Sequence, residues 1–130
     1  PIAWALARAG PDATVDAVDV NDRALALCRD NAKALGVADR VRVLRPEDVD
    51  PAVRYDQIWS NPPIRIGKEA LHELLLTWLA RLAPGGVARL VVGRNLGADS
   101  LQRWLIDQGH PTDRLASAKG FRVLTVHPAP

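Results

Sequence analysis

The sequence lacks several features that mark particular classes of protein. Its one cysteine, Cys28, leaves no partner for an internal disulfide and no cysteine-rich metal site. No apolar run approaches the ~20 residues that span a bilayer, and the sequence shows no basic-then-apolar leader with a small-residue cleavage site. We therefore expect a cytoplasmic protein that holds no metal ion and does not enter a membrane.

The composition that remains is that of a globular domain. Hydrophobic residues make up 48% of the 130 residues and charged residues 25%, which is enough for a buried core within one domain. The formal net charge of +2 arises from basic residues spread along the chain rather than massed in a tail. This charge permits an RNA partner without requiring one.

The amino end predicts a helix. Pro1 is followed by the apolar stretch Ile2-Ala3-Trp4-Ala5-Leu6-Ala7, and proline is favoured at the first position of a helix. On this interpretation a strand and a loop that should precede the helix are missing. We expect residues 1–130 to be a single domain that lacks its first strand and glycine-rich loop, with room for a further domain before it in the full-length protein.

Strand and helix patterns alternate along the rest of the chain. Short β-branched runs predict strands at 14–20, 41–44, 55–60 and 87–92, and apolar residues at steps of three and four predict helices at 21–36, 71–82 and 100–108. Residues 115–118 and 121–126, joined by a Lys119-Gly120 turn, predict an antiparallel hairpin. The expected fold is a Rossmann-like, doubly wound α/β domain with a mostly parallel sheet.

An acidic residue ends the first of these strands. In open parallel sheets ligands bind beyond the carboxyl ends of the strands, and a carboxylate there can accept the two hydroxyls of a ribose. Asp19 stands in this position. It is also placed to cap the following helix, but Asn21 or Asp22 can serve as the cap, which favours the ribose role.

Glu47-Asp48 follows the second strand. A carboxylate there can accept a hydrogen bond from an adenine amino group, although an acidic surface turn around Pro46 explains the pair nearly as well.

The turn Asn61-Pro62-Pro63-Ile64 follows the third strand. An aromatic amine is a poor nucleophile because its lone pair is delocalised into the ring, and it becomes more reactive when two acceptors hold its hydrogens. The Asn61 side-chain oxygen and the Pro62 carbonyl can be these acceptors, because consecutive prolines fix the backbone that carries them. Ile64 would then lie against the base. A rigid turn without a catalytic role is the alternative.

The stretch from Tyr55 to Lys68 resembles the small-domain methyltransferases of the ribosomal RNA guanine-N2 type, which carry an (Asn/Asp)-Pro-Pro-(aromatic) motif. The resemblance extends to the stretch after Pro1 and to the closing hairpin at Lys119-Gly120-Phe121. It implies a Rossmann-like enzyme that uses S-adenosylmethionine and methylates ribosomal RNA. Ile64 stands where most members have the aromatic residue.

The resemblance also implies roles for particular residues. The cofactor would contact Asp19, Val20, Asp48 and Asn61. The target base would lie against Asn61, Pro62, Pro63 and Ile64, and Arg65 and Lys68 would meet RNA phosphates. Lys68 is equally explained as an exposed residue in the first turn of the next helix.

Two other functions fit part of the pattern. Dehydrogenases that use a nicotinamide cofactor also place an acid such as Asp19 after a strand, but they give no reason for Asn-Pro-Pro. A non-catalytic domain of the same fold that binds RNA or a partner is the second alternative. His72 has no second ligand at zinc spacing and predicts only a helix surface residue.

Overall fold

The structure, a computed structural model, describes residues 4–8, 14–62, 66–93, 97–118 and 120–130. Along the chain these residues form strands β1 (Trp4–Arg8) and β2 (Thr14–Val18), helix α1 (Asp22–Ala34), strand β3 (Val41–Leu44), a 3-10 turn at Pro46–Asp48, and strand β4 (Tyr55–Ser60). Helix α2 (Lys68–Leu79), strand β5 (Leu82–Gly93), helix α3 (Ala98–Asp107) and strands β6 (Thr112–Ala118) and β7 (Phe121–Val126) complete the order.

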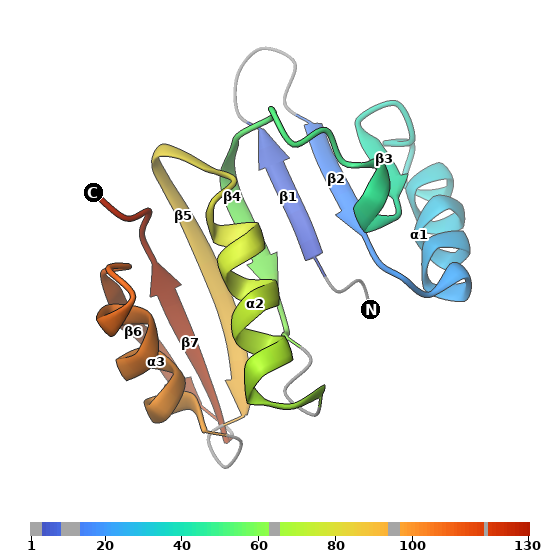
Figure 1. The fold of residues 1–130 in the computed structure, drawn as a ribbon. Helices are drawn as coiled ribbons and strands as arrows, with labels where there is room; N and C mark the ends of the chain where they lie inside the picture. Colours follow the sequence, from blue (N-terminus) through green and yellow to red (C-terminus); the bar gives the residue numbers. More distant parts are fainter. Residues whose placement is uncertain (1–3, 9–13, 63–65, 94–96, 119) are drawn as a thin grey trace.

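The described strands form one sheet in the order β3-β2-β1-β4-β5-β7-β6 (Figure 1). The pairs β2–β3 and β4–β5 are parallel, and β7 is antiparallel to both β5 and β6. This confirms the predicted doubly wound α/β fold with a carboxyl-terminal antiparallel hairpin, but the sheet is mixed rather than mostly parallel, because β1 is also antiparallel to both of its neighbours.

The prediction of a helix at the amino end is wrong. Trp4–Arg8 is a strand, antiparallel to β2 on one side and to β4 on the other, and it fills the central position that we expected to be vacant. Trp4 and Leu6 are buried and alternate with half-buried alanines, which is a period of two rather than 3.6. In this position β1 also satisfies the backbone groups of β2 and β4, which would otherwise face each other unpaired in the middle of the sheet. Pro1 lies outside the described residues.

The boundary between α2 and β5 also differs from the prediction. The helix ends at Leu79, and Leu82 already belongs to β5, so the Pro84-Gly85-Gly86 segment lies within the strand rather than before it. The amide of Tyr55, the first residue of β4, donates to the Arg81 carbonyl at 2.8 Å, so the chain pairs with β4 from the residue just before Leu82. The register between these strands is irregular between Tyr55 and Gln57.

Smaller differences concern where elements begin and end. β2 ends at Val18 rather than residue 20, α1 ends at Ala34, α3 begins at Ala98, and β6 begins at Thr112. Leu35, which caps the carboxyl end of α1, is 77% exposed.

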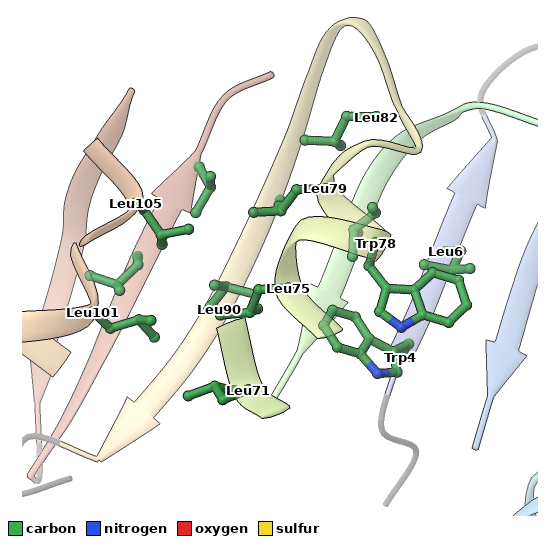
Figure 2. Close-up of a cluster of buried hydrophobic side chains, with 14 of the residues drawn as sticks. Trp4, Leu6, Leu71, Leu75, Trp78, Leu79, Leu82, Leu90, Leu101 and Leu105 are labelled. Carbon is green, nitrogen blue, oxygen red and sulfur yellow. The ribbon is translucent and has the colours of Figure 1, made fainter. Parts of the chain in front are cut away.

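Helices cover both faces of the sheet. α2 and α3 pack on one face, where Leu71, Leu75, Leu79, Leu101 and Leu105 meet strand residues such as Leu6 and Leu90 (Figure 2). α1 packs on the other face, as the groove that its Ala32 lines together with Val41 and Val43 of β3 shows. Val43 and Ala17 are in register and therefore share one face of the sheet. Val18, the residue after Ala17, points to the opposite face, into the core with α2 and α3. Trp4 and Trp78 stack at 5.5 Å and join β1 to α2.

Candidate cofactor and substrate site

The carboxyl ends of β2, β3, β4 and β5 lie at one edge of the sheet. β2 and β4 are each antiparallel to β1 and therefore parallel to each other. Figure 1 shows β2, β4 and β5 pointing toward the same edge, from which α2 and α3 begin. The strand order changes direction beside β1, and this switch point is where open α/β sheets bind ligands.

The register places Asp19 and Asn61 on either side of that switch point. Trp4 is paired with Val18 on one side and with Ser60 on the other. Asp19 and Asn61 are the next residues along β2 and β4. Two strand spacings of about 4.8 Å separate the flanking strands, so the two residues begin about 10 Å apart. A nucleoside-sized ligand can contact both.

The first of them, Asp19, is 9% exposed and held on two sides. Its backbone amide donates to the Leu44 carbonyl at 3.2 Å, and its Oδ1 accepts the Asn21 amide at 2.9 Å. The cap of α1 is Asn21, whose Oδ1 accepts from the Arg23 and Ala24 amides. Asp19 is therefore not the helix cap.

Two other predicted cofactor contacts lie beside Asp19. Val20 follows it directly and is 71% exposed, a large fraction for an apolar side chain. Asp48 ends the 3-10 turn after β3, exposed, with its amide donating to the Arg45 carbonyl. Because Leu44 at the end of β3 accepts the Asp19 amide, the structure brings these residues to the same edge of the sheet.

The predicted substrate residues are only partly within the described chain. Asn61 is exposed directly after β4, and Pro62 is buried. Pro63, Ile64 and Arg65 lie outside the described residues. Lys68 is the first residue of α2 and is exposed, and the Gly67 before it provides no side-chain cap.

A buried polar network supports the β2 and β4 strands that carry the site. The Asp16 carboxylate, 1% exposed, accepts from Arg42 Nε and Nη2 at 2.8 Å each and from the Tyr55 hydroxyl at 2.5 Å. Burial and the hydrogen bond to Asp16 raise the pKa of Tyr55 well above its ordinary value. The hydrogen bonds that Arg42 donates to Asp16, and then the negative charge of Asp16, raise the pKa of Arg42.

Sequence reasoning missed this network and a second group of residues. An acid at the middle of the β-branched run Thr14-Val15-Asp16-Ala17-Val18 was the one local signal for a buried ion pair. Nothing local indicated that Ser100 and Trp104 on α3 share a pocket with Lys68 on α2. His72, predicted as a surface residue, is half-buried and stacked on Trp104 at 3.6 Å between ring centroids. Burial, and then the charge of Lys68, lower the pKa of His72.

Metal sites and membrane-spanning helices are absent from the described part of the chain. Its described residues contain no group of three or more histidine, cysteine, aspartate or glutamate side chains placed to hold a metal ion. In the same residues no helix combines the length and apolar character needed to cross a membrane.

A known protein family matches nearly the whole chain. The profile described as "Methyltransferase small domain" matches residues 1–125. The chain is 29% identical to the Bacillus subtilis (strain 168) protein YbxB over 95% of this chain and 63% of that protein. It is 33% identical to a ribosomal RNA small subunit methyltransferase C from Shewanella halifaxensis, over 73% of this chain and 29% of that protein.

A relative with a different target is equally similar. The ribosomal protein uL3 glutamine methyltransferase of Burkholderia pseudomallei is 33% identical over 79% of this chain and 37% of that protein. The chain thus spans less than two thirds of the length of each of these relatives.

Solved structures share the fold. The ribosomal protein L11 methylase of Lactobacillus delbrueckii subsp. bulgaricus superposes with a TM-score of 0.72 at 20% identity, over 90% of this chain and 58% of that one. A 16S rRNA N2 methyltransferase from T. thermophilus, solved with AdoMet and guanosine, gives 0.64 at 17% identity, over 88% of this chain and 29% of that one.

Proposed function

The chain belongs to the methyltransferase small-domain family, and we propose that it transfers the methyl group of S-adenosylmethionine to an amino nitrogen of a nucleobase, guanine N2 of ribosomal RNA. The observation that carries this proposal is the register of β1. Trp4 lies between Val18 and Ser60, so that Asp19 and Asn61 flank the switch point at one edge of the sheet. An acid for the ribose and an acceptor for the amine therefore stand one nucleoside length apart.

The residues at the β2 and β3 ends fit the adenosine half of the cofactor. Asp19 accepts the ribose hydroxyls, since its carboxylate is fixed by the Asn21 amide and lies at the strand end. The exposed Val20 offers an apolar surface to the adenine, and Asp48 an acceptor for its amino group. S-adenosylmethionine supplies a methyl group activated by the positive charge on its sulfur.

Asn61 and the Pro62 carbonyl hold the substrate, the nucleobase that receives the methyl group. They accept the two hydrogens of the target amine and orient its lone pair along the line of transfer. Pro62 is buried at the end of β4, so this carbonyl is held before the substrate arrives. No general base is needed, because the amine proton can leave after the new bond has formed.

The family match favours methyl transfer over the nicotinamide-dependent oxidoreductase considered from the sequence. A second target does have support. The similarity to the uL3 glutamine methyltransferase makes the side-chain amide of a protein glutamine a candidate, since an amide nitrogen also presents two hydrogens to Asn61 and Pro62. The experiment therefore tests both acceptors.

The test pairs two variants with two matched controls. Asp19→Asn removes charge from the ribose acceptor and should weaken S-adenosylhomocysteine binding about tenfold in calorimetry, because hydrogen bonds to charged groups contribute about 1.5–3 kcal/mol. Asn61→Ala should lower the methylation rate about 100-fold or more and weaken cofactor binding less than Asp19→Asn does. Asp30→Asn and Asn31→Ala, on the exposed face of α1, should change neither.

Unmodified 16S ribosomal RNA and purified ribosomal proteins are the substrates, and mass spectrometry identifies the methylated product. Methylated guanine that depends on Asn61 supports the proposal. Methylation of glutamine alone would overturn the RNA target and keep the chemistry. If Asn61→Ala methylates as fast as Asn31→Ala, the Asn-Pro-Pro turn is not catalytic, and the non-catalytic interpretation of that turn gains support.

A further inference from the structure

A pocket of about 430 Å³ lies between α2 and α3. Lys68, Leu71 and His72 line it from α2, and Ser100, Leu101 and Trp104 line it from α3. Figure 2 shows Leu71 and Leu101, which belong to its apolar part, at the end of the core from which the two helices begin. Its volume falls in the range of small-molecule sites, which is about 300–1,000 Å³.

The pocket opens at the same edge of the sheet as the proposed site. α2 follows β4 and α3 follows β5, so the first turns of both helices stand at the carboxyl ends of those strands. Lys68 is separated from Asn61 only by the short connection between β4 and α2. Asn61 and the amino ends of α2 and α3, which line the pocket, therefore lie at the same edge of the sheet.

One part of the pocket favours a negative group. Lys68 contributes an ammonium group, and Ser100 contributes a hydroxyl. Asp99 in the first turn of α3 is directed elsewhere, because it pairs with Arg114 and Arg122 at 3.1 Å each. It does not line this pocket. A lysine and a hydroxyl are groups that commonly contact nucleic-acid phosphates.

The other part of the pocket favours a flat group. His72 and Trp104 are both half-buried, and their rings stack with an angle of 11° between planes. Leu71 and Leu101 are apolar neighbours of this pair. Base stacking on such aromatic surfaces is tolerant of sequence, since every base has a π-face.

We propose that this pocket holds the nucleotide adjacent to the target base, with its phosphate on Lys68 and Ser100 and its base against the His72–Trp104 pair. The proposal rests on the RNA methyl transfer proposed above and adds a subsite that grips the strand outside the reacting nucleotide. The Asn-Pro-Pro turn then acts on the amine, whereas α2 and α3 hold the adjacent part of the single strand in place.

Binding of a short fluorescent single-stranded RNA to the full chain, measured by anisotropy, tests the subsite apart from catalysis. Lys68→Ala should weaken binding several-fold and lower the salt dependence by about one counterion. His72→Ala should weaken binding about tenfold with no change in the salt dependence, because it removes a stacking surface rather than a charge. His72→Phe keeps the flat ring and should restore binding, which separates stacking from folding defects.

Two further variants distinguish the subsite from the proposed function. Lys33→Ala removes an exposed cation of α1 and should leave RNA affinity unchanged. Asn61→Ala loses a neutral contact to the target amine, so it should fail to methylate RNA while its binding keeps the salt dependence of the parent. If Lys68→Ala and His72→Ala bind as tightly as the parent, the subsite is wrong, even where Asn61→Ala confirms the chemistry. If the parent binds and methylates a glutamine-containing protein but not RNA, both the subsite and the RNA target are wrong.

Discussion

Replacement of Asp16 by alanine should destabilise the domain more than the loss of either partner of that carboxylate. Asp16 is 1% exposed and receives three hydrogen bonds, two from Arg42 and one from the Tyr55 hydroxyl. Tyr55 is itself fully buried. Asp16→Ala leaves that hydroxyl without this acceptor and removes an ion pair, for a loss of about 3 kcal/mol.

The two partners should matter less, and in a defined order. Tyr55→Phe removes one hydrogen bond to a charged group, about 1.5 kcal/mol, and leaves Asp16 paired with Arg42. Arg42→Ala should cost less than about 1 kcal/mol beyond its packing, because the Arg42 side chain is 58% exposed and water replaces much of the pair. Urea unfolding followed by circular dichroism gives the three free energies. If Asp16→Ala and Arg42→Ala are equally mild, the carboxylate is not acting as a buried acceptor.

The same network predicts a pH dependence. Burial raises the pKa of Tyr55 above the 10.0 of a free tyrosine, and the hydrogen bond to Asp16 adds to the shift. The neutral phenol is therefore favoured in the folded state. The stability that this raised pKa gives to the folded state is fully present below pH 10. Above pH 10 the free energy of unfolding falls by about 1.4 kcal/mol per pH unit, until the pH has passed the folded pKa. Tyr55 is the one tyrosine in the sequence, so tyrosinate absorbance follows it directly, and Tyr55→Phe should remove this part of the slope.

Two further predictions concern single positions. A Cβ at Gly86 would lie 2.9 Å from the Ala83 carbonyl oxygen and 3.0 Å from that of Tyr55, so Gly86→Ala should cost about 2 kcal/mol or more in thermal unfolding. A Cβ at Gly85 would contact nothing, so Gly85→Ala should lower the free energy of unfolding by only about 1 kcal/mol, the cost of a non-glycine residue at the positive φ of 79°. An equal loss at both positions would contradict the contact argument. The pKa of His72 should lie below 6.5, because of burial first and Lys68 second. In Lys68→Ala the titration midpoint of His72, followed by NMR, should rise toward 6.5 without reaching it, because burial remains. A midpoint at or above 6.5 in the parent would refute the prediction.

Local patterns explain which parts of the fold were predictable. The strands at Val41–Leu44, Tyr55–Ser60 and Phe121–Val126 have the predicted bounds, and the cap at Asn21 was foreseen as one of two choices. Such features depend on neighbours within a few residues. The amino end failed because a short apolar run fits a buried strand as well as a buried helix.

The site was predictable only as a set of separate candidates. An acid after one strand and an Asn-Pro-Pro turn after another are visible in the sequence. Their separation is not, because it depends on which strand lies between them. Pro63, Ile64 and Arg65 lie outside the described residues, so their predicted roles stay predictions.

Residue types at fixed short spacings were enough to predict the alternation of elements, the closing hairpin and the family resemblance of the Tyr55–Lys68 stretch, and they narrowed the cap of α1 to Asn21 or Asp22. The position of β1, antiparallel between β2 and β4 with Asp19 and Asn61 on either side, depends on the tertiary structure and could not be predicted locally. The tertiary structure also decided that Asp16 meets Tyr55 and that α2 and α3 enclose a pocket. Strand neighbours and helix contacts join residues far apart in the chain, and their choice depends on the packing and hydrogen bonding of the whole sheet rather than on any local pattern.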